Sequence, residues 1–270
     1  MNWRRIRNIL FKEWEDIFSD LNNILYVTLL PLLIIAEPLV VMWLVARFGG
    51  ESLIANSLIQ SAITNLSREI PSAAVLTDMQ QFQVLLLSQF KFFLMLIPTM
   101  IAVSFATFSI IEEKQSRSLE PLLATPVRTS ELLLGKALSG AIPAVLVCWA
   151  CAAIFFVGVA IMGWGGLIPQ VLTPSWYVIF FLLNPAVALL SFLLGVIGSS
   201  RAKDAKNAQN MILLIVLPVL VLIAIQIIGV VWFNLLLTLG LSIALFIVDY
   251  LTLRIAVNLF QRESILIKWS

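Results

Sequence analysis

Histidine is absent from the 270 residues, and cysteine occurs only twice. A chain without histidine lacks the commonest general base and metal ligand, so neither an H-E-x-x-H zinc site nor a Ser–His dyad can form. Charged residues are scarce as well, at 12%, whereas about a quarter of the residues in soluble domains are charged. These absences argue against a soluble enzyme, and we expect no metal site and no directly bound cofactor.

Apolar residues dominate the composition instead. Hydrophobic residues make up 61% of the chain, and its mean hydropathy is +1.02. No second composition regime marks a separate soluble part, so we expect one transmembrane domain over residues 1–270. The expected surroundings are a lipid bilayer, and we expect no nucleic-acid partner.

The apolar residues are grouped into six long runs. A spanning helix needs about 20 apolar residues, and each run is long enough. The predicted spans cover approximately residues 24–47, 84–111, 137–162, 176–198, 210–231 and 235–257. The expected fold class is therefore an all-α integral membrane protein with six transmembrane helices. We also expect the N-terminus to be retained, because no small-residue cleavage site follows the first run.

Lysine and arginine fall mostly on one side of this arrangement. Fourteen of the seventeen lie in residues 1–23, 112–136, 199–209 and 254–270. The other three are Arg47, Arg68 and Lys91. The positive-inside rule places the basic side in the cytoplasm. We therefore expect a multi-pass protein of the plasma (cytoplasmic, or inner) membrane with both termini in the cytoplasm.

The N-terminal residues 1–23 are too polar to span the bilayer but have helical periodicity. Apolar side chains recur on one face: Trp3, Ile6, Leu10, Trp14, Ile17, Phe18 and Leu21. Polar side chains occupy the opposite face: Arg4, Arg5, Asn8, Lys12, Glu15 and Ser19. The pattern predicts an amphipathic helix along the membrane surface, with tryptophans at headgroup depth. A simple anchor and a contact role are both open.

Residues 112–127, EEKQSRSLEPLLATPV, form a charged loop between two predicted spans. Leu119, Leu122 and Leu123 share one face of a short predicted helix, which Pro126 ends. Thr129 is expected to cap the next helix, with Glu131 in its first turn, where an acid suits the helix dipole. The leucines need a partner surface. Without further information, a groove on another protein and the protein's own membrane face are equally good candidates.

The stretch EEKQSRSLEPLLATPVRTSELLLGK, residues 112–136, resembles the segment after the second span in permeases of the type-2 ABC exporter family. The core of the motif is Leu119, Glu120, Leu122, Leu123, Thr125 and Pro126, and its second part is Glu131, Leu133, Gly135 and Lys136. A weaker similarity covers SSRAKDAKNAQN, residues 199–210, which resembles the cytoplasmic turn between spans four and five of that family. Together with the six-span plan, the resemblance extends over nearly the whole chain.

In that family, the segment is the coupling helix that docks in a groove of a separate ATPase subunit. The resemblance therefore implies that residues 112–127, here called the coupling segment, bind an ABC ATPase. The residues implied in this contact are Glu112, Glu113, Arg117, Leu119, Glu120, Pro121, Leu122, Leu123, Thr125 and Pro126. It also implies export by alternating access and a dimer with a second permease copy or a paralogue.

ATP and Mg²⁺ are expected on the partner ATPase. The chain has no phosphate-binding loop of the form G-x-x-x-x-G-K-[ST]. The nearest approach is SELLLGKA at residues 130–137, which has Ser130 in place of the first glycine and Ala137 in place of the metal-binding hydroxyl. We expect a non-catalytic membrane subunit.

Ionisable and amide side chains inside the predicted spans are candidates for a substrate path, because charge near the bilayer centre costs about 2.5 to 3.5 kcal/mol even on lenient scales. The candidates are Glu37, Lys91, Asn184 and Gln226. Glu37 either forms a buried pair with Lys91 or faces the substrate. Asn184, Gln226 and Asn210 also suit hydrogen bonds between helices. For Asp249 we expect a pair with Arg254 or with a basic loop residue.

Two other function classes compete with a permease: a polytopic membrane enzyme and an ATP-independent channel. Cys148 and Cys151 have thiol redox spacing, but they lie deep in the third span, so two small buried residues explain them better. A channel accounts for the spans and leaves the coupling segment unexplained. The short connection near VVWFN, between spans five and six, favours a small amphipathic drug, lipid, peptide or ion over a polymer.

Overall fold

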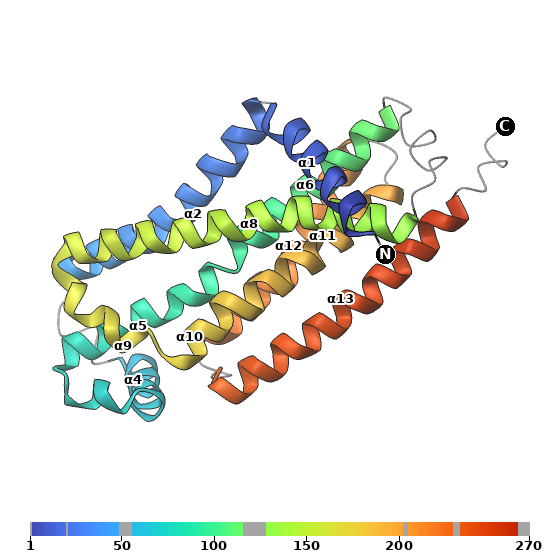
Figure 1. Ribbon diagram of the computed structural model, residues 1–270. Coiled ribbons are helices and arrows are strands. Elements are labelled where there is room, and N and C mark those ends of the chain that lie inside the picture. Colours follow the sequence, from blue (N-terminus) through green and yellow to red (C-terminus); the bar gives the residue numbers. More distant parts are fainter. Residues whose placement is uncertain are drawn as a thin grey trace.

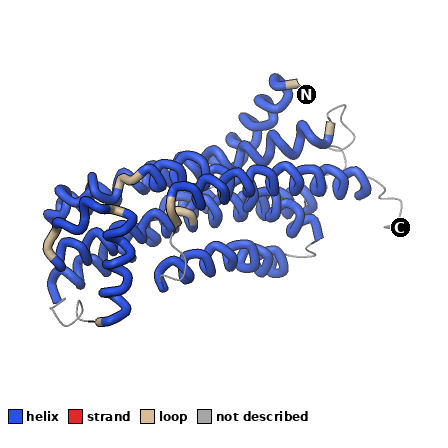
Figure 2. Tube along the Cα trace, turned by 90° about the horizontal axis from the view of Figure 1, so that it is seen from below, coloured by secondary structure: helices blue, strands red, loops and turns tan. Residues whose placement is uncertain are grey.

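The computed structural model describes residues 2–19, 21–48, 56–115, 128–201, 205–228 and 233–263. Every regular element in these ranges is a helix, as predicted (Figure 1). The long helices run side by side along one direction in both views (Figures 1 and 2). The start of α1 and the last turns of α13 lie at the same end of the bundle.

Five helical stretches of the described residues are long and apolar enough to cross a membrane: Ile24–Val45, Asp78–Ile111, Thr129–Val171, Pro174–Ser200 and Leu235–Phe260. The main helices that form them are α2 (Leu21–Phe48), α5 (Asp78–Phe93), α6 (Leu96–Gln115), α8 (Thr129–Val159), α10 (Pro174–Val178), α11 (Asn184–Arg201) and α13 (Leu235–Glu263). Five of the predicted spans are thus found, and the protein is a multi-pass membrane protein.

The remaining predicted span, residues 210–231, falls on α12 (Ala205–Ile228). Its apolar part within the described residues is Ile212–Gln226, which is shorter than a full span. At about 1.5 Å per residue, 15 residues cover only about 22 Å of a hydrocarbon core about 30 Å thick. Residues 229–231, the end of the predicted run, lie outside the described part, so the count of six stays a prediction.

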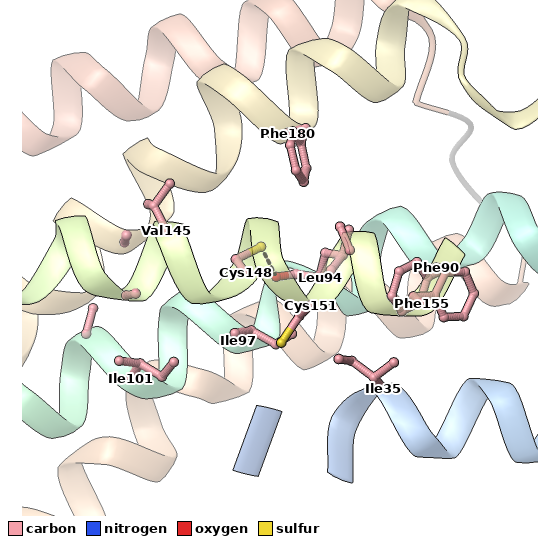
Figure 3. Packing of buried hydrophobic residues seen from close by; sticks show 14 of the residues in the cluster. Ile35, Phe90, Leu94, Ile97, Ile101, Val145, Cys148, Cys151, Phe155 and Phe180 are labelled. Carbon is pink, nitrogen blue, oxygen red and sulfur yellow. Dashed lines mark hydrogen bonds between the residues drawn. The ribbon is translucent and has the colours of Figure 1, made fainter. Parts of the chain in front are cut away.

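The second predicted span is a broken helix. Residues 94 and 95 separate α5 from α6. Pro98 explains the break, because it has no N–H to donate to the carbonyl of Leu94 four residues earlier. The Sγ atom of Cys148 on α8 donates to that carbonyl instead, at 3.4 Å (Figure 3). This contact accounts for the buried position of Cys148, and both cysteines are free thiols rather than a disulfide.

Small residues allow α6 and α11 to pack closely in the middle of the bundle. A Cβ atom placed on Gly195 would lie 2.8 Å from the Cβ of Ala106 and 3.1 Å from the carbonyl oxygen of Val103. The stretch Asp78–Ile111 is also the most buried of the five spanning stretches. Because the other helices surround it, the second span forms the axis of the fold.

Short helices gather at the end of the bundle opposite α1 (Figure 1). They are α4 (Ser57–Glu69), η1 (Pro71–Val75), η2 (Ala160–Trp164), η3 (Gly165–Leu167) and α9 (Ile168–Val171), whereas η4 (Ile179–Leu183) lies inside the spanning stretch Pro174–Ser200. The Oγ of Thr77 and the side chain of Gln80 form a capping box at the start of α5.

Candidate coupling site

The coupling segment lies between the end of α6 and the start of α8. Its central residues 116–127 are outside the described part of the chain, and so are eight of the predicted contact residues: Arg117, Leu119, Glu120, Pro121, Leu122, Leu123, Thr125 and Pro126. Glu112 and Glu113 fall in the last turn of α6, and of these two only the side chain of Glu113 is described. The structure therefore describes only the residues on either side of the segment, at the end of α6 and the start of α8, which are here called its base.

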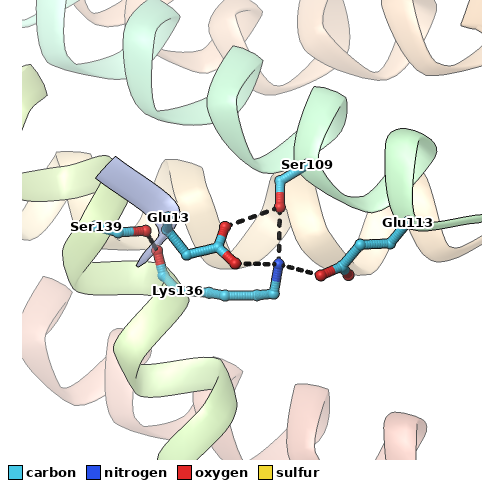
Figure 4. A network of polar contacts seen from close by, with 5 residues as sticks. All are labelled: Glu13, Ser109, Glu113, Lys136 and Ser139. Atoms are coloured by element: carbon cyan, nitrogen blue, oxygen red, sulfur yellow. Dashed lines mark hydrogen bonds and ion pairs between the residues drawn. The ribbon is translucent and has the colours of Figure 1, made fainter. Parts of the chain in front are cut away.

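Lys136 is the centre of this base (Figure 4). Its Nζ lies 2.7 Å from Oε1 of Glu113 and 3.0 Å from Oε1 of Glu13. It also donates to Oγ of Ser109 at 2.8 Å, and that hydroxyl donates to Oε2 of Glu13 at 3.2 Å. These four residues, the Lys136 cluster, join three helices: Glu13 comes from α1 (Trp3–Ser19), Ser109 and Glu113 from α6, and Lys136 from α8.

The Lys136 cluster is largely removed from water. The side chains of Lys136, Glu13 and Glu113 are 2%, 9% and 14% exposed. Burial raises the pKa of the Glu113 carboxyl, and the nearby Lys136 ammonium opposes that rise. Two carboxylates share one ammonium here, so loss of Lys136 would leave two uncompensated buried charges, which is strongly destabilising.

The start of α8 also holds the first turn of α1. Oε1 of Glu131 accepts a hydrogen bond from the backbone N–H of Asn2 at 2.6 Å, and Oε2 lies 3.7 Å from Nη1 of Arg5. Glu131 is in the first turn of α8, as predicted. The prediction that Thr129 caps this helix is wrong, because Arg128 occupies the N-cap position and Thr129 is already helical.

Two further contacts hold α1 against α8. Gly135 leaves room for α1, since a Cβ atom there would lie 2.9 Å from Cγ2 of Ile9. Pro143 cannot donate to the carbonyl of Ser139 four residues earlier, and Nε1 of Trp14 donates to that oxygen at 2.9 Å. The N-terminal helix is therefore fastened to the third span by both packing and hydrogen bonds.

The buried face of α1 differs from the predicted apolar face. Its buried side chains are Ile6, Leu10, Glu13 and Ile17, whereas Trp3 and Phe18 near its ends are exposed, as is Leu21 at the start of α2. Glu13 takes a position in the apolar repeat because Lys136 neutralises it. A charged residue at that spacing is the sequence signal that could have indicated an internal partner. That the exposed tryptophan end of α1 lies at the membrane surface stays a prediction.

One family model, described as ABC-2 family transporter protein, matches residues 7–261. The chain belongs to this family. Permeases of the ABC-2 family are generally the non-catalytic membrane component of a transporter and generally work with an ABC ATPase subunit. The match includes the coupling segment and the whole Lys136 cluster. No curated protein and no solved structure matches this ABC-2 chain.

The structure does not bring the four predicted substrate-path residues of this ABC-2 family member into one site. Glu37 is exposed on α2, and no ion pair joins it to Lys91. Lys91 is buried, with Nζ 5.2 Å from the ring centroid of Phe92. Asn184 bridges helices, since its Nδ2 donates to Sγ of Cys148 at 3.4 Å. Gln226 is buried on α12, and its Oε1 accepts no hydrogen bond from the described residues.

The predicted pair between Asp249 and Arg254 is wrong. Both carboxylate oxygens of Asp249 are buried and have no hydrogen-bond partner among the described residues. The guanidinium of Arg254 lies over the ring of Tyr250, 4.7 Å from its centroid. Asp249 and Arg254 are five positions apart on one helix, which points their side chains in different directions.

Proposed function

We propose that this protein is the permease subunit of an ATP-driven exporter and that the coupling segment docks on a separate ABC ATPase. The Lys136 cluster is the observation that carries the proposal. Its ion pair between Glu113 and Lys136 joins the two helices that lead into and out of the coupling segment. Force applied to that segment would therefore reach the second and third spans together.

The position of α1 supports the same mechanism. Glu13 ties the N-terminal helix to both flanking helices, through Lys136 and through Ser109. ATP-driven closure of the ATPases would move α1, α6 and α8 as one unit. Two permease copies would then separate on the outer side of a path at their interface. A conformational step of this kind needs contacts that differ between states, and the docked coupling segment supplies them.

The proposed cargo is a small amphipathic drug, lipid, peptide or ion, moved out of the cytoplasm across the plasma membrane. Both termini are proposed to be cytoplasmic, from the distribution of lysine and arginine. The partner ATPase would bind ATP and Mg²⁺. No observation favours the competing membrane enzyme or the ATP-independent channel.

Leu123→Asp tests the docking. If Leu122 and Leu123 fill an apolar groove on the ATPase, an aspartate in that groove is an unpaired charge, so the ATPase should dissociate or lose its stimulation by substrate. Glu120→Ala should be milder and more dependent on salt, since exposed ion pairs are screened. Co-purification of the cognate ATPase in detergent and its ATP turnover are the two readouts. Equal recovery and equal stimulated turnover for wild type and Leu123→Asp would refute the proposal.

A further inference from the structure

Glu37 has an unusual position for a carboxylate. It is exposed on α2, inside the spanning stretch Ile24–Val45, and it makes no hydrogen bond or ion pair with any described residue. At about 1.5 Å per residue it lies about 20 Å from the inner end and about 12 Å from the outer end of that stretch. Its neighbours on the exposed face are large and apolar: Leu33, Val40, Val41 and Leu44. A carboxylate facing lipid tails at this depth is costly.

A second hydrogen-bond acceptor lies about one turn before Glu37 on the same helix. Pro38 follows Glu37 and has no N–H, so the carbonyl of Ile34 lacks the donor that a helix normally provides. In two other places a carbonyl freed in this way receives a donor from another element: Leu94 from Cys148, and Ser139 from Trp14. No such donor reaches Ile34 within the described part of the chain. The Glu37 carboxylate and the Ile34 carbonyl are therefore two hydrogen-bond acceptors on neighbouring turns of α2, and no other described element donates to either.

In a two-fold symmetric dimer, each copy would contribute one unpaired Glu37 and one Ile34 carbonyl. A permease dimer with its axis along the membrane normal places equivalent residues at equal depth. The two copies of Glu37 would then lie at the same level, so neither copy supplies the other with a cation. The basic residues of the described spans do not supply one either. Lys91 and Lys136 are buried, and Arg254 lies over the ring of Tyr250. Arg47, just beyond the stretch, lies about 15 Å further along α2 at about 1.5 Å per residue.

We propose that Glu37 and the carbonyl of Ile34 bind the ammonium group of a lipophilic amine, which is the substrate class of this transporter. The inference rests on the proposed export function and names its substrate. An ammonium N–H supplies the missing donors and the missing positive charge. The alkyl or aromatic body of the same molecule packs on Leu33, Val40, Val41 and Leu44. An inorganic cation fits less well, since it needs about six oxygen ligands and these apolar neighbours provide none.

Binding of protonated N,N-dimethyldodecylamine to the purified permease in nanodiscs tests the proposal, with neutral N,N-dimethyldodecanamide as the matched probe. The wild type should bind the amine roughly tenfold or more tightly than the amide, from one charged hydrogen bond. Glu37→Gln should remove that difference, while Glu37→Asp should retain part of it. The control Asp249→Asn neutralises an acid in another span and should leave the difference unchanged.

Three results would overturn the proposal. The first is equal amine binding by wild type and Glu37→Gln. The second is a preference for the amine that Asp249→Asn abolishes. The third is saturable sodium binding that depends on Glu37 and displaces the amine, which would make this an inorganic cation site. Because the permease is measured without an ATPase, Leu123→Asp should bind the amine like wild type. If the permease binds the amine but the ATPase docking test fails, only the proposed export function is refuted.

Discussion

The Nζ atom of Lys136 lies 2.7 Å from Oε1 of Glu113, in a position where Lys136 is 2% exposed. The two residues flank residues 116–127, so the ion pair closes the base of the coupling segment. Ser109 and Glu13 complete the set of partners around the same ammonium.

Lys136→Met should destabilise the protein strongly. The substitution keeps the length of the side chain but leaves Glu13 and Glu113 buried without their cation, at a cost of about 3–5 kcal/mol. The measurement is the thermal unfolding midpoint in detergent. The matched triple variant, with Glu13→Gln and Glu113→Gln added, should recover much of the loss because it removes both carboxylates. A single Lys136→Met variant as stable as wild type would contradict the arrangement of the cluster.

Gly195→Ala should lower stability, whereas Gly240→Ala should not. A methyl group on Gly195 would lie 3.1 Å from the Val103 carbonyl oxygen and 2.8 Å from the Cβ of Ala106. Neither atom can move away by a change of side-chain rotamer. Overpacking of this kind costs about 1–3 kcal/mol. A Cβ atom on Gly240 meets nothing within 4 Å, so alanine there should stabilise its helix by about 0.5–1 kcal/mol. Unfolding midpoints of the two variants in the same detergent decide the matter, and equal shifts would count against the observed packing of α6 on α11.

Single cysteines at Ser116, Asn207 and Ser264 should be protected from an impermeant thiol reagent in intact cells. The background lacks Cys148 and Cys151. A cysteine at Ser57, which is exposed at the start of α4, should react. The expectation follows from the fourteen basic residues on the proposed cytoplasmic side. Permeabilised cells provide the control, since all four positions should then react. Reaction of Ser116→Cys from outside would reverse the orientation and remove the basis for cytoplasmic coupling.

Asp249→Leu should raise the unfolding midpoint. The carboxylate of Asp249 is buried, and no described residue donates a hydrogen bond to it, so its removal relieves a desolvation cost. Thr252→Val, on the same buried face of α13, is the control for a polar-to-apolar change without charge. A clear fall in the midpoint for Asp249→Leu alone would show that the acid has a stabilising partner in the membrane-embedded protein.

Local patterns in the sequence were sufficient for much of the fold. The apolar runs predicted the all-helical class and five of the spans, because a lipid environment imposes length and hydropathy on each segment separately. The break between α5 and α6 was missed, although Pro98 is a visible signal. Its partner Cys148 was correctly interpreted as a small buried residue, but the hydrogen bond to Leu94 depends on how two helices approach each other.

Some features of the candidate site could likewise be predicted from the sequence, and others could not. The sequence by itself determined that a polar segment separates the second and third spans and that Glu131 lies in the first turn of the helix after it, since both follow from residues close together in the chain. Only the tertiary structure decided that Glu13 belongs with Lys136, that Asp249 and Arg254 do not pair, and that Glu37 is exposed and does not pair with Lys91. Helical periodicity fixes which face of a helix a side chain occupies. Which other helix meets that face depends on packing between segments far apart in the chain, and side-chain ion pairs follow from that packing.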